Sequence, residues 1–317
     1  MVGAITLNNY TGAAAPQQYD YRETIVASAK VNWRIEDIIG GDKKLDFSKR
    51  FMPESLARVD GLSFLDQDEK RILNQIRANA YLAIFGLAEE FILPFVLDHV
   101  RPSLDDDDYR VRAFLQFASE EAKHIQHFKM FLKEFEEGFG TSCGIIGPAS
   151  AIAEEILSHE PLGIALAILH IEWMTQRHYL ESVKDDGDLD PQFKSLLRNH
   201  WLEEAQHAKL DTRMVEALAA PLGAKEIERG VDEYLEIGGF LDTGIRQQTL
   251  LDLESFEKAT GRKLNDSERE EFVDVQHQAN RWTYLGTGMT HERFLETLEK
   301  LDPTQRARIE AVSHEFC

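Results

Sequence analysis

Cysteine is scarce in this chain, which carries only Cys143 and Cys317 among its 317 residues. Two thiols cannot build a disulfide framework or a sulfur-rich zinc or iron-sulfur site. The chain also lacks a basic N-terminal segment followed by an apolar core, and a run of about 18 uninterrupted apolar residues. We therefore expect a cytoplasmic protein without a membrane span, with the first 25 residues or so loosely structured.

Basic residues are few beside acidic ones, 35 Lys and Arg against 56 Asp and Glu, for a formal net charge of -21. A surface of this sign repels phosphates and anionic lipids, so we expect neither nucleic acid nor membrane partners. Hydrophobic residues make up 43% of the chain, which is enough to bury a substantial core.

Two-residue alternation of apolar and polar residues is hard to find, whereas apolar residues at steps of three and four dominate. This pattern predicts an all-α fold. Capping boxes are predicted at Asp66 with Glu69 and at Ser267 with Glu270, and Asp-Pro helix starts at Asp190 and Asp302. The long helices are expected at residues 66–99, 107–138, 161–184 and 190–220, with a short one at 149–158.

Three segments are expected along the chain. Residues 1–65 are irregular or partly helical and pack on the core, residues 66–220 form a four-helix core, and residues 221–317 form further helices of the same domain. No tract is rich enough in Pro, Gly or Ser to separate a second domain.

Two of the predicted helices carry the same Glu-x-x-His motif on an apolar face. Glu121 and His124 lie within a stripe of phenylalanines, and Glu204 and His207 lie within a similar apolar stripe that Asp211 continues. Side chains three residues apart on a helix project together and can bind one ion. With 11 histidines in the chain, about one such motif is expected by chance. Two such motifs on apolar faces are a specific signal for a metal site.

Each of the other two long helices has a carboxylate in its apolar stripe. These carboxylates are Glu172 and, in the first helix, Glu89, with Glu90 as its competitor. Glu89 and Glu172 each precede a motif glutamate by 32 residues, which favours Glu89. A Glu from two helices and a Glu-x-x-His from two others is the pattern of ferritin-like di-iron and di-manganese carboxylate proteins. We therefore predict a ferritin-like bundle that holds two Fe ions, or Mn.

Several polar residues near the motifs have other predicted roles. Glu120 and Glu203 immediately precede the motif glutamates. They could orient a ligand histidine on a neighbouring helix, or be exposed helix charges. His127, His170 and His178 lie off the stripes and are interpreted as ordinary surface or core histidines.

Around His200, Glu204 and His207 the sequence resembles the p-aminobenzoate N-oxygenase family of ferritin-like di-iron oxygenases. That family has a third histidine one turn before its second Glu-x-x-His, and His200 stands at this place. The family usually has Asp where Glu120 and Glu203 stand, which leaves the substrate open. The resemblance covers about residues 80–220 and implies the metal ligands Glu89, Glu121, His124, Glu172, His200, Glu204 and His207.

The resemblance implies a non-haem di-iron oxygenase that activates O2 through a peroxo-type intermediate and oxidises a small organic substrate, with an amine nitrogen as one target. Such an enzyme needs an external electron donor such as a reductase or ferredoxin, and a homodimer is one assembly open to it. No catalytic residue beyond the ligands and no cofactor beyond the metals is predicted. Phe114, Phe117 and Phe128 are candidates for a pocket wall, although core packing is the favoured role for most of them.

Two other classes of protein are compatible with the motifs. One is an iron-oxidising or metal-storage protein without an organic substrate, and the other is a structural helical protein with an incidental metal. A radical-forming ribonucleotide reductase subunit is disfavoured, because Phe128 stands where such subunits usually have tyrosine.

Overall fold

The computed structural model describes residues 20–105 and 108–317, and within them the chain is helical. Pairing of extended backbone in these ranges is limited to two isolated bridges, Gly40 with Lys43 and Arg50 with Leu189. The prediction of an all-α fold is confirmed.

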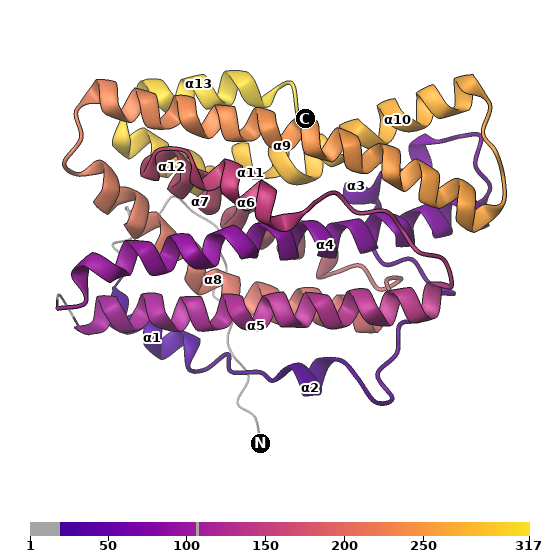
Figure 1. Cartoon of the computed structure of the whole chain (residues 1–317), viewed down its shortest axis with the longest axis horizontal. Helices are drawn as coiled ribbons and strands as arrows, with labels where there is room; N and C mark the ends of the chain where they lie inside the picture. The colour runs from indigo at the N-terminus through magenta and orange to yellow at the C-terminus, as the bar shows by residue number, and fades with distance from the viewer. Residues whose placement is uncertain (1–19, 106–107) are drawn as a thin grey trace.

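Four long helices form the core. They are α4 (Gln67–Val100), α5 (Asp108–Phe139), α7 (Pro161–Arg177) and α8 (Pro191–Ala219). α4 packs along α5, α7 packs along α8, and α5 also contacts α8. Figure 1 shows α4 and α5 running side by side, with α9 on the other side of α4. The predicted four-helix core with additional helices is therefore present.

Side-chain caps fix the start of three of these predicted helices. Asp66 accepts hydrogen bonds from the backbone of Asp68 and Glu69, and Glu69 accepts one from the backbone of Asp66, which completes a capping box. Asp190 caps α8 by accepting from the backbone of Phe193 at 2.6 Å. Asp302 caps α13 in the same way. The first N–H groups of a helix have no acceptor within the helix, so a side chain before the helix accepts their hydrogen bonds. The sequence correctly located these three capping side chains.

The predicted start at Ser267 is wrong. Helix α10 (Asp266–Arg281) is capped by Asn265, whose side chain accepts from the backbone of Glu268, and Glu268 returns the hydrogen bond. Two overlapping capping boxes exist in this sequence, and both satisfy the pattern. Leu264 is buried directly before Asn265, and this anchor places the turn two residues earlier than predicted.

The third long helix is not α-helical to its end. It was expected to continue to Lys184, but α7 gives way to a π-helical turn, η3 (His178–Val183). A second π-helical turn, η4 (Trp282–Gly286), lies nearby, and Thr287 just after it lies 2.9 Å from Nε2 of His178. The sequence pattern does not distinguish these wider turns from ordinary helix.

Smaller elements surround the core. Residues 1–19 lie outside the described part, but the expectation of loose structure up to residue 25 is wrong, because α1 (Tyr21–Ser28) packs on α5 and α8. The longest helix, α9 (Ala224–Thr260), lies against α7 and α4. The remaining elements are α2 (Ile35–Ile38), α3 (Glu54–Ala57), η1 (Val59–Gly61), η2 (Arg101–Ser103), α6 (Ala149–Leu157), α11 (Thr287–Met289), α12 (Glu292–Leu301) and α13 (Pro303–Ser313).

Helix α4 is long and apolar enough to cross a membrane by length and composition alone. Within its most apolar stretch, 56% of the residues are buried inside the protein. This is what the central helix of a bundle requires, since it contacts α5, α6 and α9.

Candidate metal centre

Two groups of metal-ligating side chains meet in the middle of the bundle. The first contains Glu89, His124, His200 and Glu204, and the second contains Glu121, His124, Glu204 and His207. In each group the ligand atoms all lie within 4.8 Å of one another, and every member is buried. His124 and Glu204 belong to both groups. The two groups therefore form one continuous centre with room for two ions.

The apolar stripes place these side chains. Phe117 and Phe128 are fully buried on the face of α5 that carries Glu121 and His124. The Phe117 ring stacks on His207 at 4.1 Å, and the Phe128 ring contacts His200 at 5.0 Å, both between centroids. Burying this aromatic face draws the carboxylate and imidazole groups into the core with it.

Glu89 and its neighbour Glu90 have different surroundings. Glu89 is buried, and its Oε1 lies 3.1 Å from Nε2 of His200. Glu90 is partly exposed and pairs with Lys129 at 2.9 Å. The structure thus places Glu89 in the centre and Glu90 outside it.

Glu172 belongs to neither group of four but lies against one of their members. It is buried on α7, and burial together with the charge and hydrogen bond of Glu204 raises its pKa well above the usual value. Its Oε2 has no hydrogen-bond partner. Glu172 is therefore close enough to the centre for its predicted role as a ligand, which stays a prediction.

Glu120 and Glu203 orient the two motif histidines from the opposite helix. Nε2 of His124 lies 2.8 Å from Oε2 of Glu203, and Nε2 of His207 lies 2.9 Å from Oε2 of Glu120. The two carboxylates are 4% and 1% exposed, so the alternative of exposed helix charges is wrong. A carboxylate on the outer nitrogen fixes the ring and leaves Nδ1 free for an ion.

The inner nitrogen of each motif histidine faces carboxylates. Nδ1 of His124 lies 3.0 Å from Oε1 of Glu204, and Nδ1 of His207 lies 2.8 Å from Oε1 of Glu121. Burial lowers the pKa of His124 and His207, but the surrounding carboxylates outweigh it and raise both pKa values well above the usual one. Without a metal, these protons are what balances the buried negative charge.

Two residues that no sequence motif marks, Trp33 and Ser28, cover the centre from outside the bundle. Trp33 stacks on His124 with 6.1 Å between ring centroids and nearly parallel planes. Lys123 pairs with Glu203 and lies 4.0 Å from the centroid of the Trp33 ring. On the other side, Ser28 donates to Glu120. Both covering residues come from the segment before α4, whose sequence carries no motif.

Unsatisfied buried oxygens show that the centre suits cations. Hydrogen-bond partners are missing for Oε2 of Glu89, for Oε2 of Glu121 and for both carboxylate oxygens of Asp211. Asp211 is buried one turn after His207, and burial raises its pKa well above the usual value. Buried carboxylates without partners are costly. Two divalent ions would satisfy them, and oxygen-rich ligation suits iron or manganese.

The three histidines that lie off the stripes are buried in the core. His178 contacts the hydroxyl groups of Tyr81 and Thr287 at 2.8 and 2.9 Å. His170 contacts the Tyr234 hydroxyl at 2.8 Å. His127 lies in neither metal group, and burial lowers its pKa to about 3. They are core histidines, one of the two roles predicted for them.

No family model and no curated protein matches the chain. Solved structures of R2-like ligand-binding oxidase variants are similar to it. A variant with an Fe/Fe cofactor is 13% identical, covering 81% of this chain and 90% of that chain with a TM-score of 0.45. A variant with a Mn/Fe cofactor is 12% identical, with 82% and 92% covered and a TM-score of 0.44. Likeness at this level is no evidence of a shared activity, which must come from the site itself.

Proposed function

We propose that this protein is a non-haem di-iron oxygenase, with manganese as an alternative metal, that uses O2 to oxidise a small organic substrate. The observation that carries the proposal is the pair of buried Glu and His groups that share His124 and Glu204. A purely structural role does not require buried carboxylate oxygens to converge without partners in the core.

The chain's own residues would hold the ions in defined places. Glu89 and His200 serve one position, Glu121 and His207 serve the other, and His124 and Glu204 lie within reach of both. Two redox-active ions bound here would supply the binding and reduction of O2.

The residues around the ligands keep the site oriented and dry. Glu120 and Glu203 accept hydrogen bonds from the Nε2–H groups of His207 and His124. This holds each ring with Nδ1 toward the centre. The rings of Phe117 and Phe128 exclude water from the ligands.

Oxidation of an amine nitrogen is the finer part of the proposal. It rests on the resemblance to p-aminobenzoate N-oxygenases, in which His200 stands at the place of the additional histidine. In support, Nε2 of His200 lies 2.7 Å from Oε1 of Glu204 and 3.1 Å from Oε1 of Glu89. An external one-electron donor completes the proposed system.

Oxygen uptake distinguishes the oxygenase from a storage protein. The protein is loaded anaerobically with Fe(II), and O2 consumption is followed while reductant and a panel of aryl amines are varied. We expect O2 consumption in proportion to reductant and to organic substrate, with oxidised product detected by mass spectrometry. If the protein instead oxidises on the order of hundreds of Fe(II) ions per chain and retains them as mineral, it is a storage protein.

Replacing His200 by alanine tests the N-oxygenase-like assignment. We expect the variant to keep both ions, because the other ligands remain, but to show a changed absorption spectrum and turnover lowered by about tenfold or more. His127→Ala is the control, since His127 is buried on α5 outside both groups. Unchanged spectra and turnover in the His200 variant would reduce His200 to a packing residue.

A further inference from the structure

A hydrophobic pocket lies beside the metal centre. It has a cavity volume of about 90 Å³ and is partly open to solvent, where Phe240 is 37% exposed. Its walls come from α4, α7 and α9, and residues of the loop before α6, of α6 and of η4 complete it. The lining residues include Phe85, Ala88, Ile171, Met174, Gly244 and Tyr284.

The lining has almost no polar chemistry. Tyr284 is the single lining residue in the described chain with a polar side-chain atom, and no lining residue is charged. Burial raises the pKa of Tyr284, so its hydroxyl group stays neutral. A carboxylate or ammonium group entering this pocket would lose its hydration without gaining a partner. The pocket therefore selects an uncharged molecule.

The size of the pocket limits its occupant. An apolar cavity of about 150 Å³ binds benzene, and the cavity here is about 90 Å³. A small ring or short chain fits if it extends toward the open side at Phe240. Larger or rigid polycyclic molecules do not fit.

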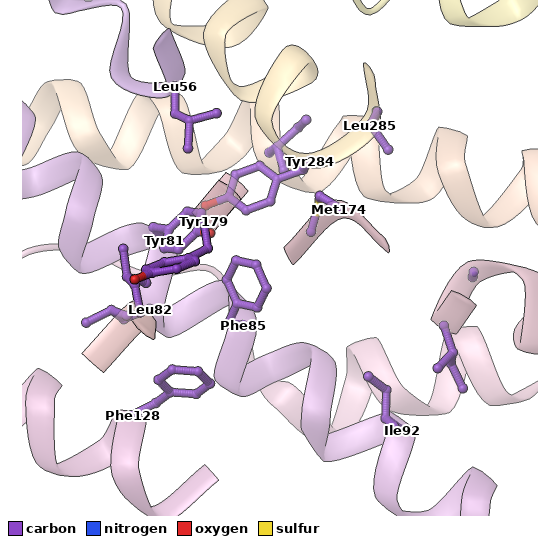
Figure 2. Packing of buried hydrophobic residues seen from close by; sticks show 14 of the residues in the cluster. Leu56, Tyr81, Leu82, Phe85, Ile92, Phe128, Met174, Tyr179, Tyr284 and Leu285 are labelled. Atoms are coloured by element: carbon purple, nitrogen blue, oxygen red, sulfur yellow. The ribbon is translucent and has the colours of Figure 1, made fainter. Parts of the chain in front are cut away.

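One aromatic ring separates the pocket from the metal centre. Phe85 lines the pocket, and the other side of its ring contacts His200 edge to face at 5.8 Å between centroids. Figure 2 shows Phe85 between Phe128 on one side and Met174 and Tyr284 on the other. Ala88 and Ile171, which also line the pocket, immediately precede Glu89 and Glu172 in the sequence. The helices that supply predicted ligands thus also supply the pocket walls.

We propose that this pocket binds the organic substrate, and that the substrate is a small, uncharged, apolar aryl molecule. This inference rests on the proposed function, because the bound molecule is a substrate only if the protein is an oxygenase. A neutral aryl amine satisfies both the pocket and the amine chemistry, whereas an aryl amine bearing a carboxylate does not. The Phe85 ring stands between the bound molecule and the metal centre, so oxygen transfer requires this ring to turn aside.

Paired probes of equal size test the selection by charge. Toluene and benzoate are titrated separately into the metal-loaded protein, and binding is followed by ligand-observed NMR. We expect toluene to bind at least about 100-fold more tightly than benzoate, since no cation compensates the buried carboxylate. Equal affinities, or no measurable toluene binding, would overturn the proposal.

Glycine substitutions on α9 locate the binding. A Cβ at Gly244 would meet only Cδ1 of Ile146, at 3.6 Å, so Gly244→Leu fills the pocket without a backbone clash. A Cβ at Gly239, which lies five residues earlier on α9 and is exposed, would meet nothing within 4 Å, and Gly239→Leu is the matched control. We expect toluene affinity to fall at least about tenfold in Gly244→Leu and to stay unchanged in the control.

Further readouts separate the two proposals. If Gly244→Leu does not fold, Leu241→Trp fills the same pocket from the same helix. Loss of toluene binding in the filled variant would support the pocket. If the protein nevertheless shows no substrate-dependent O2 consumption, the oxygenase proposal is wrong. Substrate-dependent O2 consumption unaffected by either filling variant would leave the oxygenase and end this inference.

Discussion

Replacing His124 by alanine is expected to lower the metal content from about two ions per chain to about one or fewer. His124 belongs to both groups of ligands, so its loss weakens both positions. The bundle should stay folded, because helical stability comes from the apolar faces. Glu203 also keeps its ion pair with Lys123 in the variant. The measurement is elemental analysis after iron-supplemented expression, with circular dichroism to verify folding.

The matched control for this experiment is His127→Ala on the same helix. His127 is equally buried but lies outside both groups, and neither of its ring nitrogens has a hydrogen-bond partner. The His127→Ala variant should retain the full metal content. Two ions retained in the His124 variant, or equal losses in both variants, would show that the converging side chains do not form the metal centre.

The thermal stability of the metal-free protein is expected to fall as the pH rises from about 7.5 to 9. Burial raises the pKa of Glu89, Glu172 and Asp211 in the folded protein. The neighbouring carboxylates outweigh the effect of burial and raise the pKa of His124 and His207. A group with a raised pKa binds more protons in the folded than in the unfolded state. Its stabilisation is therefore complete below the unfolded pKa and is lost as the pH rises through the folded pKa.

Two glutamates have the opposite shift, but it acts in another pH range. The hydrogen bonds and charges around Glu120 and Glu204 outweigh their burial and lower both pKa values, that of Glu120 to about 2. Their stabilisation is lost only below the unfolded carboxyl pKa, about 4.3. Burial also lowers the pKa of the core histidines His127, His170 and His178, and these groups stop affecting stability once the pH is well above the unfolded histidine pKa of about 6.5. Between about pH 7.5 and 9 the groups with raised pKa values therefore decide the slope.

Saturating Mn(II) should remove most of this pH dependence, because metal ions replace the protons and bind better as the ligands deprotonate. At a thousandfold excess over Kd, binding contributes about 4 kcal/mol. This corresponds to a Tm increase of about 10 °C near pH 8 and a smaller one at pH 5.5. Differential scanning fluorimetry with Mn(II) or with EDTA measures both curves. A metal-free Tm that rises across this range, or an equal Mn(II) effect in His124→Ala, would contradict the interpretation.

The covering residues illustrate what sequence reasoning could not reach. Trp33 and Ser28 lie in a segment without a motif, yet they contact His124 and Glu120 from outside the bundle. Their contacts join residues about 90 positions apart, and no local pattern encodes such pairs. Phe114, Phe117 and Phe128 take the other role predicted for them, core packing. They do not line the hydrophobic pocket, which lies on the other side of Phe85.

The sequence by itself determined the helices, their caps and the two Glu-x-x-His faces. These features depend on helical periodicity and on hydrogen bonds within a few residues, which are local. It also predicted Glu89 rather than Glu90 for the inner face. Only the tertiary structure decided which nitrogen of each histidine faces the centre, that Glu120 and Glu203 cross between helices, and where the pocket lies. These depend on the packing of helices distant in sequence, whose rotation and separation are set by the whole core.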